Sequence, residues 1–103
     1  MDANNQEINE LGILENQLQN FLANKQVLQI ELNEINNALE ELSKYDGEIY
    51  KILSGLMMRT SKEKVKNDLS SRKKILTLQV DSFEKQQKIV EKKLEEHKKR
   101  LFK

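Results

Sequence analysis

Few side chains in this sequence could do chemistry, and their spacing does not gather them into a site. The chain has one histidine, His97, and no cysteine, which excludes disulfides and thiolate metal sites. No glycine-rich phosphate loop follows a strand-like run. The acidic pairs Glu40-Glu41 and Glu95-Glu96 belong to helix-like segments that offer no pocket. We therefore predict that the chain is not an enzyme, with no catalytic or cofactor-binding residues, no cofactor and no metal site.

Three further features have an ordinary and a functional interpretation. His97 falls on an apolar stripe opposite Leu11, where we expect a helix-end packing residue rather than a ligand or base. The pair Met57-Met58 is either an adaptable contact surface or strand packing within an oligomer. The basic run Lys98, Lys99, Arg100 and Lys103 is either a solvated helix face or a docking surface for an acidic partner.

Two leucine-rich heptad series would position these side chains. Apolar residues recur at alternating spacings of three and four over residues 11–42 and again over residues 69–101. Residues equally far from the chain midpoint near Ser54 form matched pairs, such as Leu14 with Leu94. This is the pattern of a long antiparallel two-helix coiled coil. With 37% hydrophobic and 34% charged residues and no proline, the composition also favours long amphipathic helices.

One polar residue, Lys25, interrupts the first apolar series. Such a residue fixes register or partner choice at some cost in stability. In the matched register Lys25 faces Phe83, so we expect its stem to pack on the ring and its ammonium to reach the ring edge.

The charge is divided between the two halves of the chain. Residues 1–61 hold 4 basic and 10 acidic residues, whereas residues 62–103 hold 14 and 7. The opposite charges favour pairing of the two helices within one chain. They argue against nucleic-acid binding by the second helix, and no apolar run is long enough to span a membrane. We predict no nucleic-acid partner and no membrane partner.

Between the helices the periodicity changes to that of a β-hairpin. Two β-prone runs flank Ser54-Gly55, and a two-residue turn pairs Leu53 with Leu56 and Ile52 with Met57. Apolar side chains would then cover both faces, and a lone ribbon of this kind is marginal in stability. We therefore predict an oligomer assembled through shared hairpins, using the side chains of Ile49, Tyr50, Ile52, Leu53, Leu56, Met57 and Met58.

The predicted fold is mainly α: one unit over residues 1–103, a long antiparallel two-helix coiled coil with one central β-hairpin that joins an oligomeric β-barrel. The first helix is expected over about 4–43, the hairpin over about 48–60 and the second helix over about 62–102. Thr60 or Ser61 would serve as N-cap of the second helix.

The hairpin segment and its flanks resemble the beta-type subunit of prefoldin, an archaeal and eukaryotic co-chaperone. The similarity covers nearly the whole chain. Its most specific part is the run Ile49-Tyr50-Lys51, a small-residue turn, Leu56-Met57-Met58-Arg59 and Thr60-Ser61-Lys62-Glu63. The family usually has glycine where this chain has Ser54, which leaves the turn geometry open.

The resemblance implies a cytoplasmic, ATP-independent holdase. Prefoldin is a hexamer of two alpha-type and four beta-type subunits whose hairpins form β-barrels. Its coiled-coil tips hold unfolded client proteins and pass them to a group II chaperonin. In this chain the free ends bring together Ile8, Leu11, Ile13, Leu14, Leu101 and Phe102, which either contact clients or simply complete the apolar stripe. The alternative function is a structural coiled-coil adaptor or spacer without client-holding activity.

Overall fold

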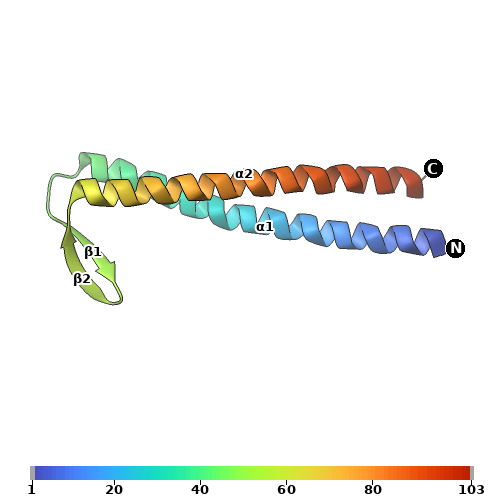
Figure 1. The fold of residues 1–103 in the computed structure, drawn as a ribbon, viewed down its shortest axis with the longest axis horizontal. Helices are drawn as coiled ribbons and strands as arrows, with labels where there is room; N and C mark the ends of the chain where they lie inside the picture. Colours follow the sequence, from blue (N-terminus) through green and yellow to red (C-terminus); the bar gives the residue numbers. More distant parts are fainter. Residues whose placement is uncertain (1, 103) are drawn as a thin grey trace. The chain divides into compact units, whose positions relative to one another are not determined.

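The chain forms two long helices with one β-hairpin between them, which confirms the predicted fold class (Figure 1). A computed structural model describes residues 2–102. Helix α1 covers Asp2–Lys44, strand β1 Ile49–Leu53, strand β2 Leu56–Thr60 and helix α2 Lys62–Leu101. The side chains of residues 2–4 lie outside the described part.

Local signals in the sequence set the start and the end of α2. The Ser61 hydroxyl accepts a hydrogen bond of 3.2 Å from the backbone N–H of Lys64, so Ser61 is the N-cap. Glu63 lies in the first turn, and the last turn holds Lys98, Lys99 and Arg100. An acidic residue near the N-terminus and basic residues near the C-terminus both interact favourably with the helix dipole.

The connection from α1 to β1 is a short segment with one close backbone approach. Helix α1 ends as the backbone N–H of Tyr45 donates to the Leu42 carbonyl at 3.3 Å. The Lys62 ammonium donates to the Tyr45 carbonyl at 3.2 Å. A Cβ at Gly47 would overlap the Tyr45 ring, so glycine lets the ring lie against the backbone.

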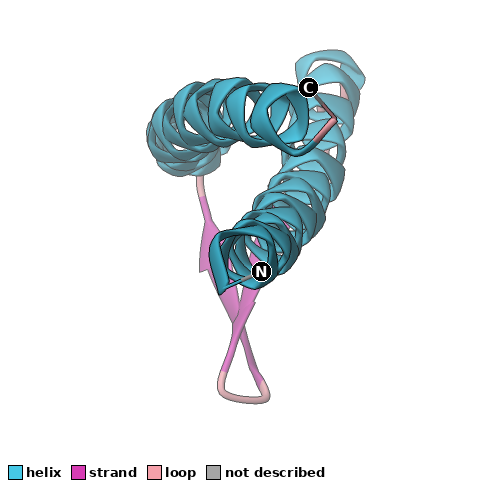
Figure 2. Cartoon of the chain, turned by 90° about the vertical axis from the view of Figure 1, so that its right-hand side faces the viewer, coloured by secondary structure: helices cyan, strands magenta, loops and turns pink. Residues whose placement is uncertain are grey.

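The hairpin has the register that the two-residue turn predicts. Leu53 is opposite Leu56 and Ile52 is opposite Met57, and the pairing continues to Ile49 opposite Thr60. Figure 2 shows the twisted ribbon and its turn. Ser54 and Gly55 have φ angles of 51° and 80°, the two positive values that a type I′ turn needs.

The helices pack in two units, each with its own part of the apolar stripe. The first unit, Met1–Leu28 with Gln79–Lys103, has a core of Leu14, Val90 and Leu94, against which Leu11, Leu18 and Phe21 pack. In the second unit, Gln29–Leu78, the side chains of Leu32, Ile35 and Leu76 are buried. The predicted partners Leu14 and Leu94 therefore share one core.

The polar position in the stripe, Lys25, makes other contacts than expected. Its ammonium donates to Gln87 Oε1 at 3.2 Å and lies 3.9 Å from Glu84 Oε1. The Phe83 ring instead pairs with Phe21, with centroids 6.1 Å apart and planes tilted by 43°. The long lysine stem reaches polar groups along α2, which satisfy an ammonium better than a ring edge does.

Candidate functional site

The hairpin carries a large exposed apolar surface. Ile52 and Met57, opposite each other on one face, are 71% and 68% exposed. Leu53, Leu56 and Met58 are exposed on the other face. Neither strand has a further strand partner within residues 2–102. The ribbon thus offers two apolar faces and two free edges to another chain.

A polar cluster stabilises the base of the hairpin. The Tyr50 hydroxyl donates to Glu48 Oε2 at 2.6 Å, and Arg59 Nη2 lies 3.1 Å from Glu48 Oε1. The hydrogen bond to Glu48 raises the pKa of Tyr50, because the bond is lost when the phenol ionises. Tyr50 is therefore a half-exposed ring with its polar end already paired, and Ile49 beside it is partly buried.

The helix ends combine a closed core with a few exposed apolar side chains. Of the six predicted tip residues, Leu14 is buried in the core, and Leu11 and Leu101 are partly buried. Ile8, Ile13 and Phe102 are exposed, Phe102 to 80%. The six residues therefore divide into a packed set and an exposed set of three.

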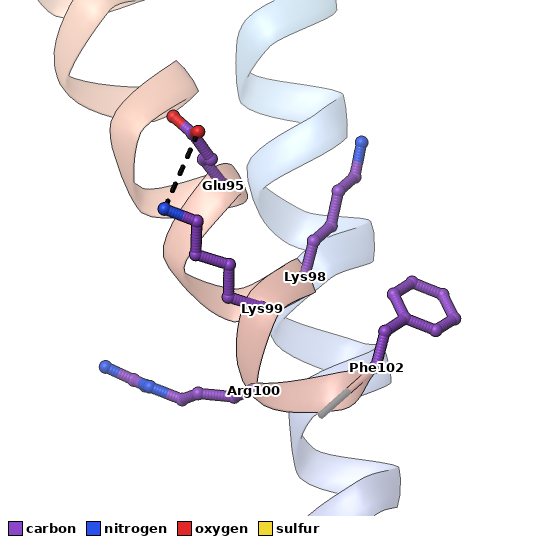
Figure 3. A pocket seen from close by; sticks show the side chains of 5 residues that line it. All are labelled: Glu95, Lys98, Lys99, Arg100 and Phe102. Carbon is purple, nitrogen blue, oxygen red and sulfur yellow. Dashed lines mark ion pairs between the residues drawn. The ribbon is translucent and has the colours of Figure 1, made fainter.

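The last turn of α2 is basic, and Phe102 follows it directly (Figure 3). Lys98, Lys99, Arg100 and Phe102 line an open hollow of about 590 Å³ together with Glu95. Lys99 Nζ lies 3.8 Å from Glu95 Oε1 within the helix. Cationic and apolar groups thus lie side by side at this end. Lys103, the fourth residue of the predicted basic run, lies outside the described residues.

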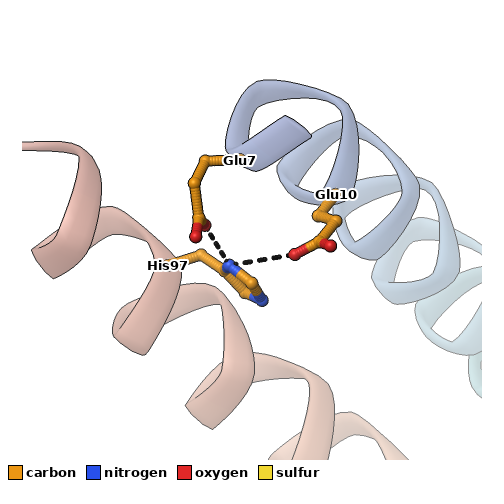
Figure 4. A group of neighbouring side chains, drawn as sticks. All are labelled: Glu7, Glu10 and His97. Carbon is orange, nitrogen blue, oxygen red and sulfur yellow. Dashed lines mark hydrogen bonds and ion pairs between the residues drawn. The ribbon is translucent and has the colours of Figure 1, made fainter. Parts of the chain in front are cut away.

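A group of side chains that the sequence analysis missed surrounds His97. Its Nδ1 contacts Glu7 Oε2 and lies 3.4 Å from Glu10 Oε2 (Figure 4). Arg100 Nη1 lies 3.6 Å from the other Glu7 oxygen. The hydrogen bond with His97 is the main cause that lowers the pKa of Glu7, although its partial desolvation opposes the shift.

A signal for this group was present in the sequence. The matched register puts His97 opposite Leu11, and Glu7 and Glu10 are the neighbouring positions spaced three apart, which lie on one helix face. His97 is packed, as predicted, with 15% of its side chain exposed. Its polar partners were not predicted.

Comparison with known proteins decides the family. The family model described as "Prefoldin subunit" matches residues 5–103. The chain belongs to the prefoldin family. Among curated prefoldin beta subunits, that of Saccharolobus islandicus strain L.S.2.15 is 40% identical over 85 residues, covering 81% of this chain and 68% of the relative. That of Sulfurisphaera tokodaii is 36% identical over 94 residues, covering 89% and 75%.

Solved prefoldin structures share the fold. The prefoldin beta subunit from Thermococcus strain KS-1 superposes with a TM-score of 0.93 at 27% identity, covering 98% of this chain and 90% of that one. The beta2 subunit of the same strain matches in fold, with a TM-score of 0.77 at 18% identity. The predicted resemblance to beta-type prefoldin is therefore confirmed, and with it a prefoldin chaperone role. None of the helices described between residues 2 and 102 has the length and apolarity to cross a bilayer.

Proposed function

We propose that this chain is a subunit of an ATP-independent holdase that captures unfolded proteins at the helix ends and delivers them to a group II chaperonin. In this proposal residues 1–103 act as one prefoldin-like unit in the cytoplasm. The observation that carries the proposal is the exposure of Ile8, Ile13 and Phe102 beside a closed core. Prefoldin family membership supports the same role.

Assembly follows from the hairpin. Exposed side chains on both faces, led by Ile52 and Met57, would be covered by hairpins of neighbouring subunits, and the free edges would pair with their strands. We propose a hexamer of two alpha-type and four beta-type subunits built around such β-barrels. This arrangement leaves the helix ends to bind clients.

Client capture uses weak apolar contacts. Ile8, Ile13 and Phe102 already lie exposed, so binding a client segment requires no opening of the Leu14 core. Each contact is small, and several subunits acting together raise the affinity through effective concentration. Binding of this kind suits many sequences and needs no nucleotide.

The test replaces the exposed set in the full chain. Ile8→Ser, Ile13→Ser and Phe102→Ser, combined and assembled with an alpha-type subunit, should abolish protection of a denatured protein against aggregation. The hexamer should persist by native mass spectrometry. Full protection by this variant would contradict the tip assignment and favour the adaptor function.

A matched control uses exposed apolar residues elsewhere in the same unit. Leu22→Ser, Val27→Ser and Ile89→Ser, combined, remove three exposed apolar side chains away from the helix ends. This variant should protect as well as wild type. An equal loss in both variants would mean that general surface apolarity, rather than the tips, holds clients.

The basic end of α2 is the proposed docking surface for the chaperonin. Lys98, Lys99 and Arg100 lie beside Phe102 and would meet an acidic surface. Charge reversal of Lys98, Lys99, Arg100 and Lys103 to Glu should weaken capture of the chaperonin. High salt, which screens the same charges, should weaken capture by the wild type in a similar way. Unchanged capture would remove this assignment.

A further inference from the structure

The cluster of Glu7, Glu10 and His97 joins the first turns of α1 to the last turns of α2, and the proposed chaperone function does not use it. We propose that it binds one divalent transition-metal ion that accepts both nitrogen and oxygen ligands, and Zn²⁺ is the ion we use to test it. The imidazole would supply a nitrogen ligand and the two carboxylates one oxygen each. The proposal does not depend on client binding.

The spacing of the three ligand atoms fits a single ion. One nitrogen and two carboxylate oxygens lie within 4.8 Å of one another. Zinc bonds of about 2.0 Å in a tetrahedral site separate two ligands by about 3.3 Å. The distance of 3.4 Å between Glu10 Oε2 and His97 Nδ1 matches that edge. Glu7 Oε2 contacts Nδ1 more closely than that edge, so the Glu7 side chain would have to rotate away from the ring to take the third ligand position.

A proton on His97 Nδ1 satisfies the two carboxylates less well than a metal ion would. A single N–H at Nδ1 can form one good hydrogen bond, here with Glu7, whereas 3.4 Å is long for a second bond to Glu10. Arg100 Nη1 lies 3.6 Å from the far oxygen of Glu7, so Glu7 has a second cationic neighbour, whereas the contact of Glu10 with His97 is the long one. A doubly charged ion between the three ligand atoms would bring Glu10 into direct contact with positive charge as well.

The surroundings leave room for an ion to enter. His97 and Glu7 are mostly shielded, with 15% and 23% of their side chains exposed, whereas Glu10 is 54% exposed. The open side by Glu10 is lined also by Lys93 and Glu96. Water would complete the coordination on that side, as in sites with three protein ligands.

The composition of the chain makes the assignment testable. With one histidine and no cysteine in 103 residues, an imidazole or thiolate ligand for zinc can come from His97 alone. Chelator-treated, tag-free full-length protein should bind one equivalent of Zn²⁺ by calorimetry. The His97 ring signals should shift on saturation, and Co²⁺ should give a visible absorption band. Mg²⁺, which prefers oxygen ligands, should bind far more weakly.

Single substitutions then distinguish Zn²⁺ binding at this cluster from nonspecific Zn²⁺ binding to other carboxylates. His97→Gln, Glu7→Gln and Glu10→Gln should each weaken Zn²⁺ binding at least about tenfold. Glu95→Gln removes an exposed carboxylate of the same helix end and should leave binding unchanged. Because Glu10 is mostly exposed, its variant keeps the fold even if His97→Gln loosens the helix ends. Absence of saturable binding, or binding that His97→Gln and Glu10→Gln do not weaken, would overturn the proposal in favour of a proton-only pair.

Discussion

The hairpin and the helix ends both expose apolar side chains, but they do so in different ways. On the hairpin the exposed side chains cover both faces of a two-stranded ribbon with free edges. At the helix ends three side chains are exposed, whereas Leu14, Val90 and Leu94 form a closed core. The first surface is unstable in water until another strand covers it, whereas the second is stable as it stands. In the proposed function the first surface would suit permanent assembly and the second reversible binding.

The largest expected effect comes from polar substitution on the hairpin. The double variant Ile52→Asp and Met57→Asp places two like charges opposite each other on one face of the ribbon. We expect complete loss of oligomer by native mass spectrometry, with helix content by circular dichroism largely retained. Leu78→Asp, which changes an equally exposed residue of α2, should leave the oligomer intact. Assembly of the double variant would remove the distinction between the two surfaces.

The next effect tests the closed core at the helix ends. Leu94→Ala empties a buried position and should lower the free energy of unfolding by about 3 kcal/mol. Ile89→Ala on the same helix, where the side chain is half exposed, should cost about 1 kcal/mol or less. Urea unfolding at one fixed subunit concentration measures both, because oligomer stability depends on concentration. Equal costs would show that the core near Leu94 is not closed.

The pairing of residues along the apolar stripe was predictable from the sequence because the turn and the heptad spacing allow few registers. A two-residue turn fixes the hairpin register, and the heptad spacing then fixes which leucines face each other, as Leu14 and Leu94 do. Side chains with long flexible stems were less predictable. The Lys25 ammonium lies by Gln87 and Glu84 rather than at the edge of the Phe83 ring, because a flexible lysine side chain can reach several partners within one helical turn.

The candidate site was only partly predictable for a related reason. Heptad spacing places Leu14 on the stripe, but it does not say whether the stripe is open or closed at its end; the packing of Val90 and Leu94 closes it. His97 was predicted to pack, and the geometry that brings Glu7 and Glu10 to its ring depends on rotamers that spacing alone does not specify.

A smaller effect concerns the polar position within the otherwise apolar stripe. Lys25→Met replaces a partly buried ammonium with an unbranched apolar chain of similar length. We expect the free energy of unfolding to change by no more than about 1 kcal/mol, because the lost bond to Gln87 is offset by apolar burial. A loss well above that value in urea unfolding would mean that the Lys25 contacts hold the helices together.

The smallest effect is a titration in the hairpin. The bond to Glu48 raises the pKa of Tyr50, so its stabilising contribution is complete below the ordinary tyrosine value of 10.0 and is lost as the pH rises through the higher folded value. Ultraviolet difference spectra should show Tyr50 ionising above that ordinary value. Glu48→Gln should bring the titration back toward it, and no movement would show that the pair is not formed in solution.

The turn of the hairpin has a consequence for engineering. Ser54 adopts a left-handed backbone conformation at φ 51°, which costs a residue other than glycine or asparagine about 1 kcal/mol. This cost opposes formation of the turn, and in the proposed assembly contacts with neighbouring hairpins would offset it. Ser54→Asn would favour the turn conformation before assembly. The resulting rise in the rate of assembly would measure how much of the barrier to complex formation comes from ordering the turn.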